Sequence, residues 1–267
     1  MSVPRSCAGM EARPRAPWVL LRGLVRESRH WGALPDLLAQ ALPADTILCP
    51  DLPGNGVRND QPSPTRIEAM VEDCRATLTG SGHLPPYHLL GLSMGGMVAA
   101  SWAASHPHEV AALVLINTSM RPFSPFHERL RPACYAQLLR AAAAADNLPR
   151  REALILGLVS NHTARRDAAL PAWVALARQN PVSRKNAIRQ LLAAARFRAS
   201  AAAPAAPALV LASQQDRLVA AACSQALARA WGTALAVHPA AGHDLPLDDA
   251  PWVVDEMVAW LKRRGTG

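Results

Sequence analysis

The residues best suited to chemistry are a serine, an aspartate and a histidine, which occur in that order along the chain. Ser93 lies in the motif Gly91-Leu92-Ser93-Met94-Gly95, between an apolar run that ends at Leu90 and a segment of helical composition. Glycines two residues before and after the serine permit a turn so sharp that a Cβ atom there would clash, and the turn lifts the hydroxyl above a sheet. A serine hydroxyl is a weak nucleophile without a base, so the motif predicts a partner histidine and an acid.

Two later positions supply these partners. Asp216 stands just past the carboxyl end of a predicted strand at 207–212, and His243 stands in Ala241-Gly242-His243-Asp244, between the last predicted strand and the last predicted helix. The carboxyl ends of parallel strands meet at one edge of a sheet, so the three side chains can converge there. The eight other histidines lack this setting.

The elements that must position these residues alternate between strands and helices over the first 117 residues, which is typical of βαβ units and a parallel sheet. Short apolar runs predict strands at 18–21, 46–49, 87–90 and 110–116, and strand character returns at 207–212 and 234–237. Helices are predicted from the capping-box spacing of Thr65 and Glu68 to about Leu78, from Met94 to Ser105, and from about Pro251 to Arg264.

A long segment without strand character interrupts this α/β pattern. From about Ser119 the sequence predicts only helical segments rich in alanine, leucine and arginine, punctuated by prolines such as Pro149 and Pro171. The chain is therefore divided into a first core part at 1–118, a helical insertion at 119–206 and a second core part at 207–267.

The composition of the 267-residue chain, with 50% apolar and 18% charged residues, is that of a globular protein rather than a disordered one. Apolar runs stop at about seven residues, far short of the roughly 18 that a membrane-spanning helix needs. The segment before Trp18 has no apolar core, so no secretory signal is expected. The five cysteines are dispersed and odd in number, which indicates neither a disulfide framework nor a zinc site and favours a reducing cytoplasm.

Together, these features resemble the α/β-hydrolase superfamily of serine hydrolases, in particular carboxylesterases of the pimeloyl-acyl-carrier-protein methyl ester esterase type. The resemblance spans the chain from Trp18 to Arg264 and includes Asp51-Leu52-Pro53-Gly54-Asn55-Gly56, which is similar to the family's D-x-P-G-x-G loop. It implies an α/β-hydrolase fold, a mostly parallel central sheet flanked by helices, in which residues 119–206 form an all-helical cap over the active site.

The resemblance also implies roles for individual residues. Ser93 corresponds to the nucleophile, His243 to the general base and then acid, and Asp216 to the residue that fixes the imidazole tautomer. Asn117 stands at the alternative position for the acid, and an amide cannot do that work, which favours Asp216.

An oxyanion hole formed by the backbone N–H groups of Leu24 and Met94 is implied in the same way. Relatives commonly have His-Gly before the first of these donors, whereas this chain has Arg22-Gly23, and a backbone donor survives a change of side chain. Arg22 and Trp31 are candidate substrate-binding residues. No metal and no organic cofactor is implied.

The excess of positive charge lies in the insertion. Residues 119–206 carry 14 basic and four acidic side chains, and the rest of the chain carries 14 basic and 16 acidic ones. A basic patch attracts anionic ligands, so the cap could dock an acidic acyl carrier protein. The alternative is that the arginines cover the solvated outer faces of helices, where charge runs usually lie. A nucleic-acid partner is not expected, because interleaved aromatic residues and a known module are missing.

The sequence therefore predicts a cytoplasmic serine esterase that acts on a small-molecule or acyl-carrier-bound carboxylic ester, with no membrane partner. Other reactions of the same triad, such as lactone opening, perhydrolysis or C–C bond hydrolysis, are alternatives. A non-catalytic binder on a hydrolase scaffold is a further alternative, against which the complete set of serine, aspartate and histidine argues.

Overall fold

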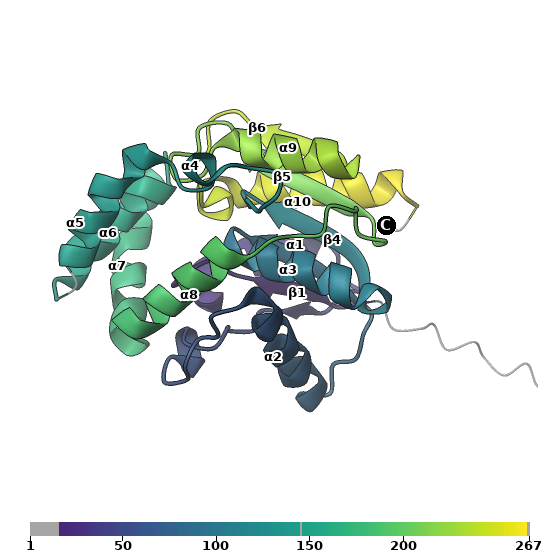
Figure 1. Cartoon of the computed structure of the whole chain (residues 1–267), viewed down its shortest axis with the longest axis horizontal. Coiled ribbons are helices and arrows are strands. Elements are labelled where there is room, and N and C mark those ends of the chain that lie inside the picture. The colour runs from purple at the N-terminus through teal and green to yellow at the C-terminus, as the bar shows by residue number, and fades with distance from the viewer. Residues whose placement is uncertain (1–15, 145, 266–267) are drawn as a thin grey trace, which may run out of the picture.

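A six-stranded sheet forms the centre of the computed structural model, which describes residues 16–144 and 146–265 (Figure 1). All paired strands are parallel and lie in the order β2-β1-β3-β4-β5-β6, which confirms the predicted parallel sheet. The strands are β1 (Trp18–Leu21), β2 (Ile47–Leu48), β3 (Tyr87–Leu92), β4 (Val110–Ile116), β5 (Ala208–Ser213) and β6 (Ala234–His238).

Helices cover both faces of this sheet. Side chains alternate along each strand, so that Trp18 and Leu20 pack into one core and Val19 and Leu21 into the other. The first core lies against α1 (Leu34–Ala41) and α10 (Leu245–Arg263), and the second against α2 (Ile67–Gly80), α3 (Met94–Ser105) and α9 (Ala221–Trp231). The sheet is buried on both faces, so its side chains are apolar throughout and the functional groups lie at the strand ends.

Two helix predictions differ from the structure. Helix α2 begins at Ile67 with an extended Arg66 as its N-cap and without a side-chain capping bond, so the capping box predicted from Thr65 and Glu68 is wrong. The last helix begins at Leu245 rather than near Pro251, because a kink at Asp249 joins a short helical segment to the main one.

Between β4 and β5 the described chain forms helices and no strand of the sheet. They are α4 (Phe126–Arg129), α5 (Tyr135–Ala143), α6 (Leu148–Val159), α7 (Thr163–Gln179) and α8 (Arg184–Arg196). Helices α5, α6 and α7 stand beside the core as a layer of their own (Figure 1), with Leu156 and Trp173 buried between them. Pro171, predicted to punctuate the helices, lies inside α7 on an exposed side, where water can reach the carbonyl that loses its hydrogen bond.

In the described part of the chain, no helix is both long enough and apolar enough to cross a bilayer. The cysteines of the same part, Cys49, Cys74, Cys134 and Cys223, are free thiols. Cys7 and most of the segment in which a secretory signal was not expected lie outside the described residues.

The start of α3 passes so close to β1 that a side chain is excluded. A Cβ atom on Gly95 would lie 1.9 Å from the carbonyl oxygen of Leu21, and one on Gly91 would lie 2.4 Å from the carbonyl oxygen of Gly95. These distances confirm that the turn around Ser93 needs glycine at both predicted positions.

Gly95→Ala should therefore lower the free energy of unfolding by about 3 kcal/mol or more, because the added methyl group meets backbone atoms that cannot move aside. Gly80→Ala is the matched control, since a Cβ atom there meets no atom within 4 Å at the end of α2, and it should be neutral or slightly stabilising. Urea unfolding measures both, and equal midpoints for the two variants would contradict the steric argument.

Candidate active site

Ser93 stands at the turn between β3 and α3 in a conformation that few residues adopt. Its backbone has φ 56° and ψ −117°, a strained region for a residue other than glycine. From Leu89 to Ala103 it is the one residue that is not buried. The turn thus brings a single hydroxyl to the surface of an otherwise closed core.

Asp216 and His243 form a buried pair after β5 and β6. Nδ1 of His243 lies 2.7 Å from Oδ2 of Asp216, and the two residues are 4% and 2% exposed. The other carboxylate oxygen of Asp216 accepts hydrogen bonds from the backbone N–H groups of Leu218 and Val219, at 2.8 and 2.9 Å. With the carboxylate held and Nδ1 engaged, Nε2 of His243 is the nitrogen left to act as a base.

Charged neighbours raise the pKa of His243 above its ordinary value. Burial acts to lower the pKa, but the charge and hydrogen bond of Asp216 raise it, and Asp244 adds to the rise while Arg22 opposes it. An imidazolium at this position is therefore stabilised, as a base that must accept a proton requires.

Asn117 ties the histidine loop to β4, a role that the sequence analysis did not assign to it. Its side-chain nitrogen donates to the backbone carbonyl of His243 at 2.8 Å. The residues on either side hold the serine turn: the Ser93 N–H donates to the carbonyl of Ile116 at 2.9 Å, and Thr118 Oγ1 donates to the carbonyl of Ser93 at 2.8 Å. A carboxylate could not donate a hydrogen bond to the carbonyl of His243. The amide side chain at the end of this strand was therefore the sequence feature that could have indicated this role.

Arg22 and Trp31, the candidate substrate-binding residues, are both buried, at 3% and 1% exposed. The Arg22 guanidinium makes two bonds to the Asp244 carboxylate, at 3.2 and 2.5 Å, and lies over the Trp31 ring at 4.8 Å from its centroid. Arg22 precedes the loop of Leu24, and Asp244 follows His243. This arrangement favours a positioning role for Arg22 over direct contact with a ligand.

The predicted oxyanion donors flank the serine. Met94 directly follows Ser93 and is 1% exposed, and Leu24, partly buried, follows Gly23. A Cβ atom on Gly23 would lie 3.3 Å from Cβ of Ser93, so the loop after β1 packs directly against the turn. Such contact is what two N–H groups from different loops need in order to face one oxygen.

The segment between α6 and α7 is bound to the histidine loop through Asp248, a residue that no sequence signal marked. Its carboxylate accepts hydrogen bonds from the Gly242 N–H at 2.7 Å, from Ser160 Oγ at 2.5 Å and from the Asn161 N–H at 3.0 Å. Ser160 and Asn161 lie between α6 and α7, so these helices are joined to the segment that carries His243.

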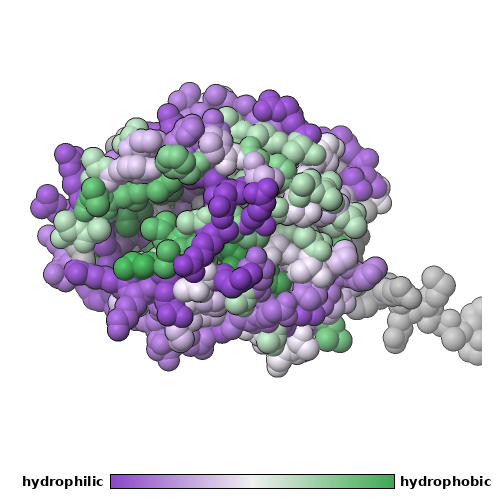
Figure 2. Space-filling model, viewed as in Figure 1, coloured by the Kyte–Doolittle hydropathy of each residue, from purple (hydrophilic) through white to green (hydrophobic). Residues whose placement is uncertain are grey.

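The face shown in Figure 2 is hollowed beside α8, and much of the surface inside the hollow is hydrophobic. Helix α8 buries two polar side chains, Asn186 and Gln190, whereas its apolar Ile188 and Leu191 are 59% and 51% exposed. Gln190 Oε1 accepts the N–H of Val25 at 2.8 Å, which ties the helix to the loop after β1. The exposed apolar surface suits a ligand with an apolar part.

Within residues 16–144 and 146–265, no group of three histidine, cysteine, aspartate or glutamate side chains is placed to hold a metal ion.

The sequence is similar to known proteins of one family. The sequence profile described as "Alpha/beta hydrolase family" matches residues 18–256. The chain is 37% identical over 100 residues to the lipase LipV of Mycobacterium tuberculosis, across 38% of this chain and 36% of that protein. It is 36% identical over 93 residues to the pimeloyl-[acyl-carrier protein] methyl ester esterase of Chromobacterium violaceum, across 34% of each protein. The matched region thus spans about a third of the length of these curated relatives.

Solved structures resemble the chain over most of its length. A thermophilic esterase from Thermogutta terrifontis has a TM-score of 0.70 and 25% identity, covering 93% of this chain and 90% of that one. The enol-lactonase from Burkholderia xenovorans has a TM-score of 0.75 and 20% identity, covering 93% and 92%. These similarities confirm the fold predicted from the sequence.

The opposing effects of Asp244 and Arg22 on the pKa of His243 can be measured. Asp244→Asn should lower the pKa, because it removes a negative charge that favours the imidazolium, and Arg22→Gln should raise it, because it removes a positive charge that opposes it. NMR titration of the imidazole in variants whose thermal melts show a folded protein gives both values. Shifts of the same sign would contradict this account of the buried pair.

Proposed function

The chain belongs to the alpha/beta hydrolase family, and we propose that it is a serine esterase that cleaves a carboxylic ester through an acyl-enzyme. The observation that carries the proposal is the partly exposed Ser93 on its strained turn, together with the buried pair of Asp216 and His243 after neighbouring strands. The lipase and the methyl ester esterase among the relatives support this class of reaction.

In the proposed mechanism, Oγ of Ser93 attacks the carbonyl carbon of the ester while Nε2 of His243 accepts its proton. The N–H groups of Leu24 and Met94 stabilise the negative oxygen of the tetrahedral intermediate. When the bond to the alcohol oxygen breaks, His243 returns the proton to the leaving alcohol. A water molecule activated by the same nitrogen then hydrolyses the acyl group from Ser93, and Asp216 stabilises the imidazolium in both halves of the reaction.

The raised pKa of His243 suits this cycle, because the imidazole must take up a proton twice in each turnover. The hydrophobic hollow beside α8 supports an ester with an apolar chain (Figure 2). We place the enzyme in the cytoplasm, as the sequence predicts, and the free thiols of the described chain support this placement.

Ser93→Ala should lower the rate of hydrolysis of p-nitrophenyl esters by at least about a thousandfold, because no other nucleophile can form the acyl-enzyme. Esters graded from acetyl to palmitoyl give the preferred chain length. Ser105→Ala removes an exposed hydroxyl at the other end of α3 and should leave the rate unchanged. A folded protein that is not labelled at Ser93 by a fluorophosphonate would overturn the proposal.

The proposed substrate is a free small-molecule ester, with an acyl-carrier-bound ester as the alternative. Cap cations such as Arg178, Arg184 and Lys185 are exposed, the arrangement of a solvated outer face. Reversing these three charges to glutamate should leave kcat/KM for small esters and for carrier-bound esters in the same ratio. A loss of at least tenfold confined to the carrier-bound ester would instead establish the cap as a docking surface.

A further inference from the structure

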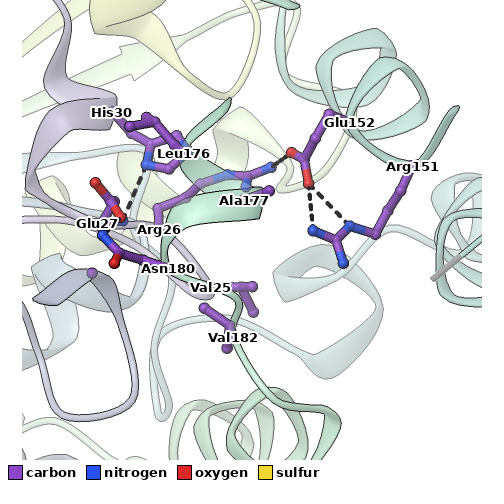
Figure 3. A pocket seen from close by; sticks show the side chains of 11 residues that line it. Val25, Arg26, Glu27, His30, Arg151, Glu152, Leu176, Ala177, Asn180 and Val182 are labelled. Carbon is purple, nitrogen blue, oxygen red and sulfur yellow. Dashed lines mark hydrogen bonds and ion pairs between the residues drawn. The ribbon is translucent and has the colours of Figure 1, made fainter. Parts of the chain in front are cut away.

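A small pocket lies between the loop after β1 and the cap helices α6 and α7 (Figure 3). One side carries the charged groups of Arg26, Arg151 and Glu152, and the side facing Arg151 carries the apolar side chains of Val25 and Val182. The cavity has a volume of about 30 Å³. One water molecule needs roughly 10–15 Å³, so the cavity has space for a carboxylate group.

The charged groups that line this pocket, counted together with Arg29 outside it, carry one excess positive charge. Glu152 is 1% exposed, and its carboxylate accepts a hydrogen bond from Nε of Arg151 at 3.0 Å and pairs with Nη2 of Arg26 at 3.1 Å. Glu27 also lines the pocket, but its carboxylate is paired with Arg29 and accepts a bond from Asn180. Two guanidinium groups therefore share one carboxylate, which leaves the pocket attractive to an anion.

His30 adds a hydrogen-bond donor. Its Nδ1 accepts the backbone N–H of Glu27 at 3.2 Å, and burial, together with the charges of Arg26 and Arg22, holds its pKa well below the usual value. The imidazole is thus neutral with its proton on Nε2. That buried nitrogen makes no hydrogen bond within the described chain, and the ring packs edge-on against Trp173 at 5.0 Å between centroids. A donor without an acceptor here is costly unless a ligand supplies one.

The pocket is within reach of a substrate held at Ser93. Its wall includes Val25, two residues after Gly23, and a Cβ atom on Gly23 would lie 3.3 Å from Cβ of Ser93. Two residues span at most about 7 Å, so Val25 lies no more than about 12 Å from the serine. A chain of several methylene groups bridges that distance.

We propose that this pocket binds a carboxylate at the far end of the substrate, so that the enzyme hydrolyses half-esters of dicarboxylic acids. This proposal rests on the proposed esterase function. Water cleaves the ester bond at Ser93 to give an alcohol and a second carboxylate, and the distal carboxylate is not changed. Arg151 sets the specificity, with the methylene chain against Val25 and Val182.

The test compares mono-p-nitrophenyl half-esters of dicarboxylic acids from succinic to sebacic with neutral p-nitrophenyl esters of equal chain length. At the best length, the wild-type enzyme should prefer the half-ester by at least tenfold in kcat/KM. Arg151→Ala should reduce that preference at least tenfold, mainly through KM, and Arg151→Lys should restore part of it. Arg150→Ala removes the same charge from an exposed position on the same helix and should leave the preference unchanged.

Each other outcome overturns one proposal and spares the other. Equal kcat/KM for half-esters and neutral esters at every length, with Ser93 active, would overturn the carboxylate pocket and leave the esterase standing. Equal losses for Arg150→Ala and Arg151→Ala would assign the effect to long-range charge and also overturn the pocket. Should Arg151→Ala fail to fold, inhibition of the wild type decides: adipate should compete at least tenfold better than hexanoate, and equal inhibition refutes the proposal.

Discussion

The contact between the start of α3 and the end of β1 is the constraint on which the rest of the site depends. Leu21, the last residue of β1, pairs with Gly91 near the end of β3, so the two strands end side by side. The backbone of Gly95 then crosses the carbonyl of Leu21 with no space for a side chain. Because packed backbone cannot yield as a flexible side chain can, this crossing holds Ser93 against the loop that carries Leu24.

Polar contacts extend that rigidity to the later strands. Asn117 holds the histidine loop, and Arg22 joins the loop after β1 to Asp244, next to His243. Burying an ion pair such as Arg22 and Asp244 costs desolvation that its attraction barely offsets, so its contribution to stability is small. The pair contributes more by fixing the Arg22 guanidinium in one orientation, through two parallel hydrogen bonds to Asp244 and the contact with the Trp31 ring.

The sequence predicts those parts of the molecule that local patterns encode. Buried parallel strands are short apolar runs, so the sequence predicts the strands within two residues, and Ser93, Asp216 and His243 each lie in the turn or loop that follows such a run. The roles of Asn117 and Asp248 were missed because their partners are far along the chain: Asp248 meets Ser160 across 88 residues. No local pattern distinguishes a buried aspartate such as Asp248 from one in a solvated loop, whereas the amide of Asn117 at the end of a strand was a local signal.

Helix α6 and the turn after it contact the core at two places. Asp248 binds the turn between α6 and α7 to the histidine loop, and Glu152 on α6 pairs with Arg26 in the loop after β1. The same helix therefore borders both the loop of His243 and the charged pocket. Neither contact can shift without disturbing buried polar groups. In the proposed reaction, the packing of α6 would therefore set the distance between the reacting carbonyl and the distal carboxylate, and we expect kcat/KM to depend on the length of the chain between them.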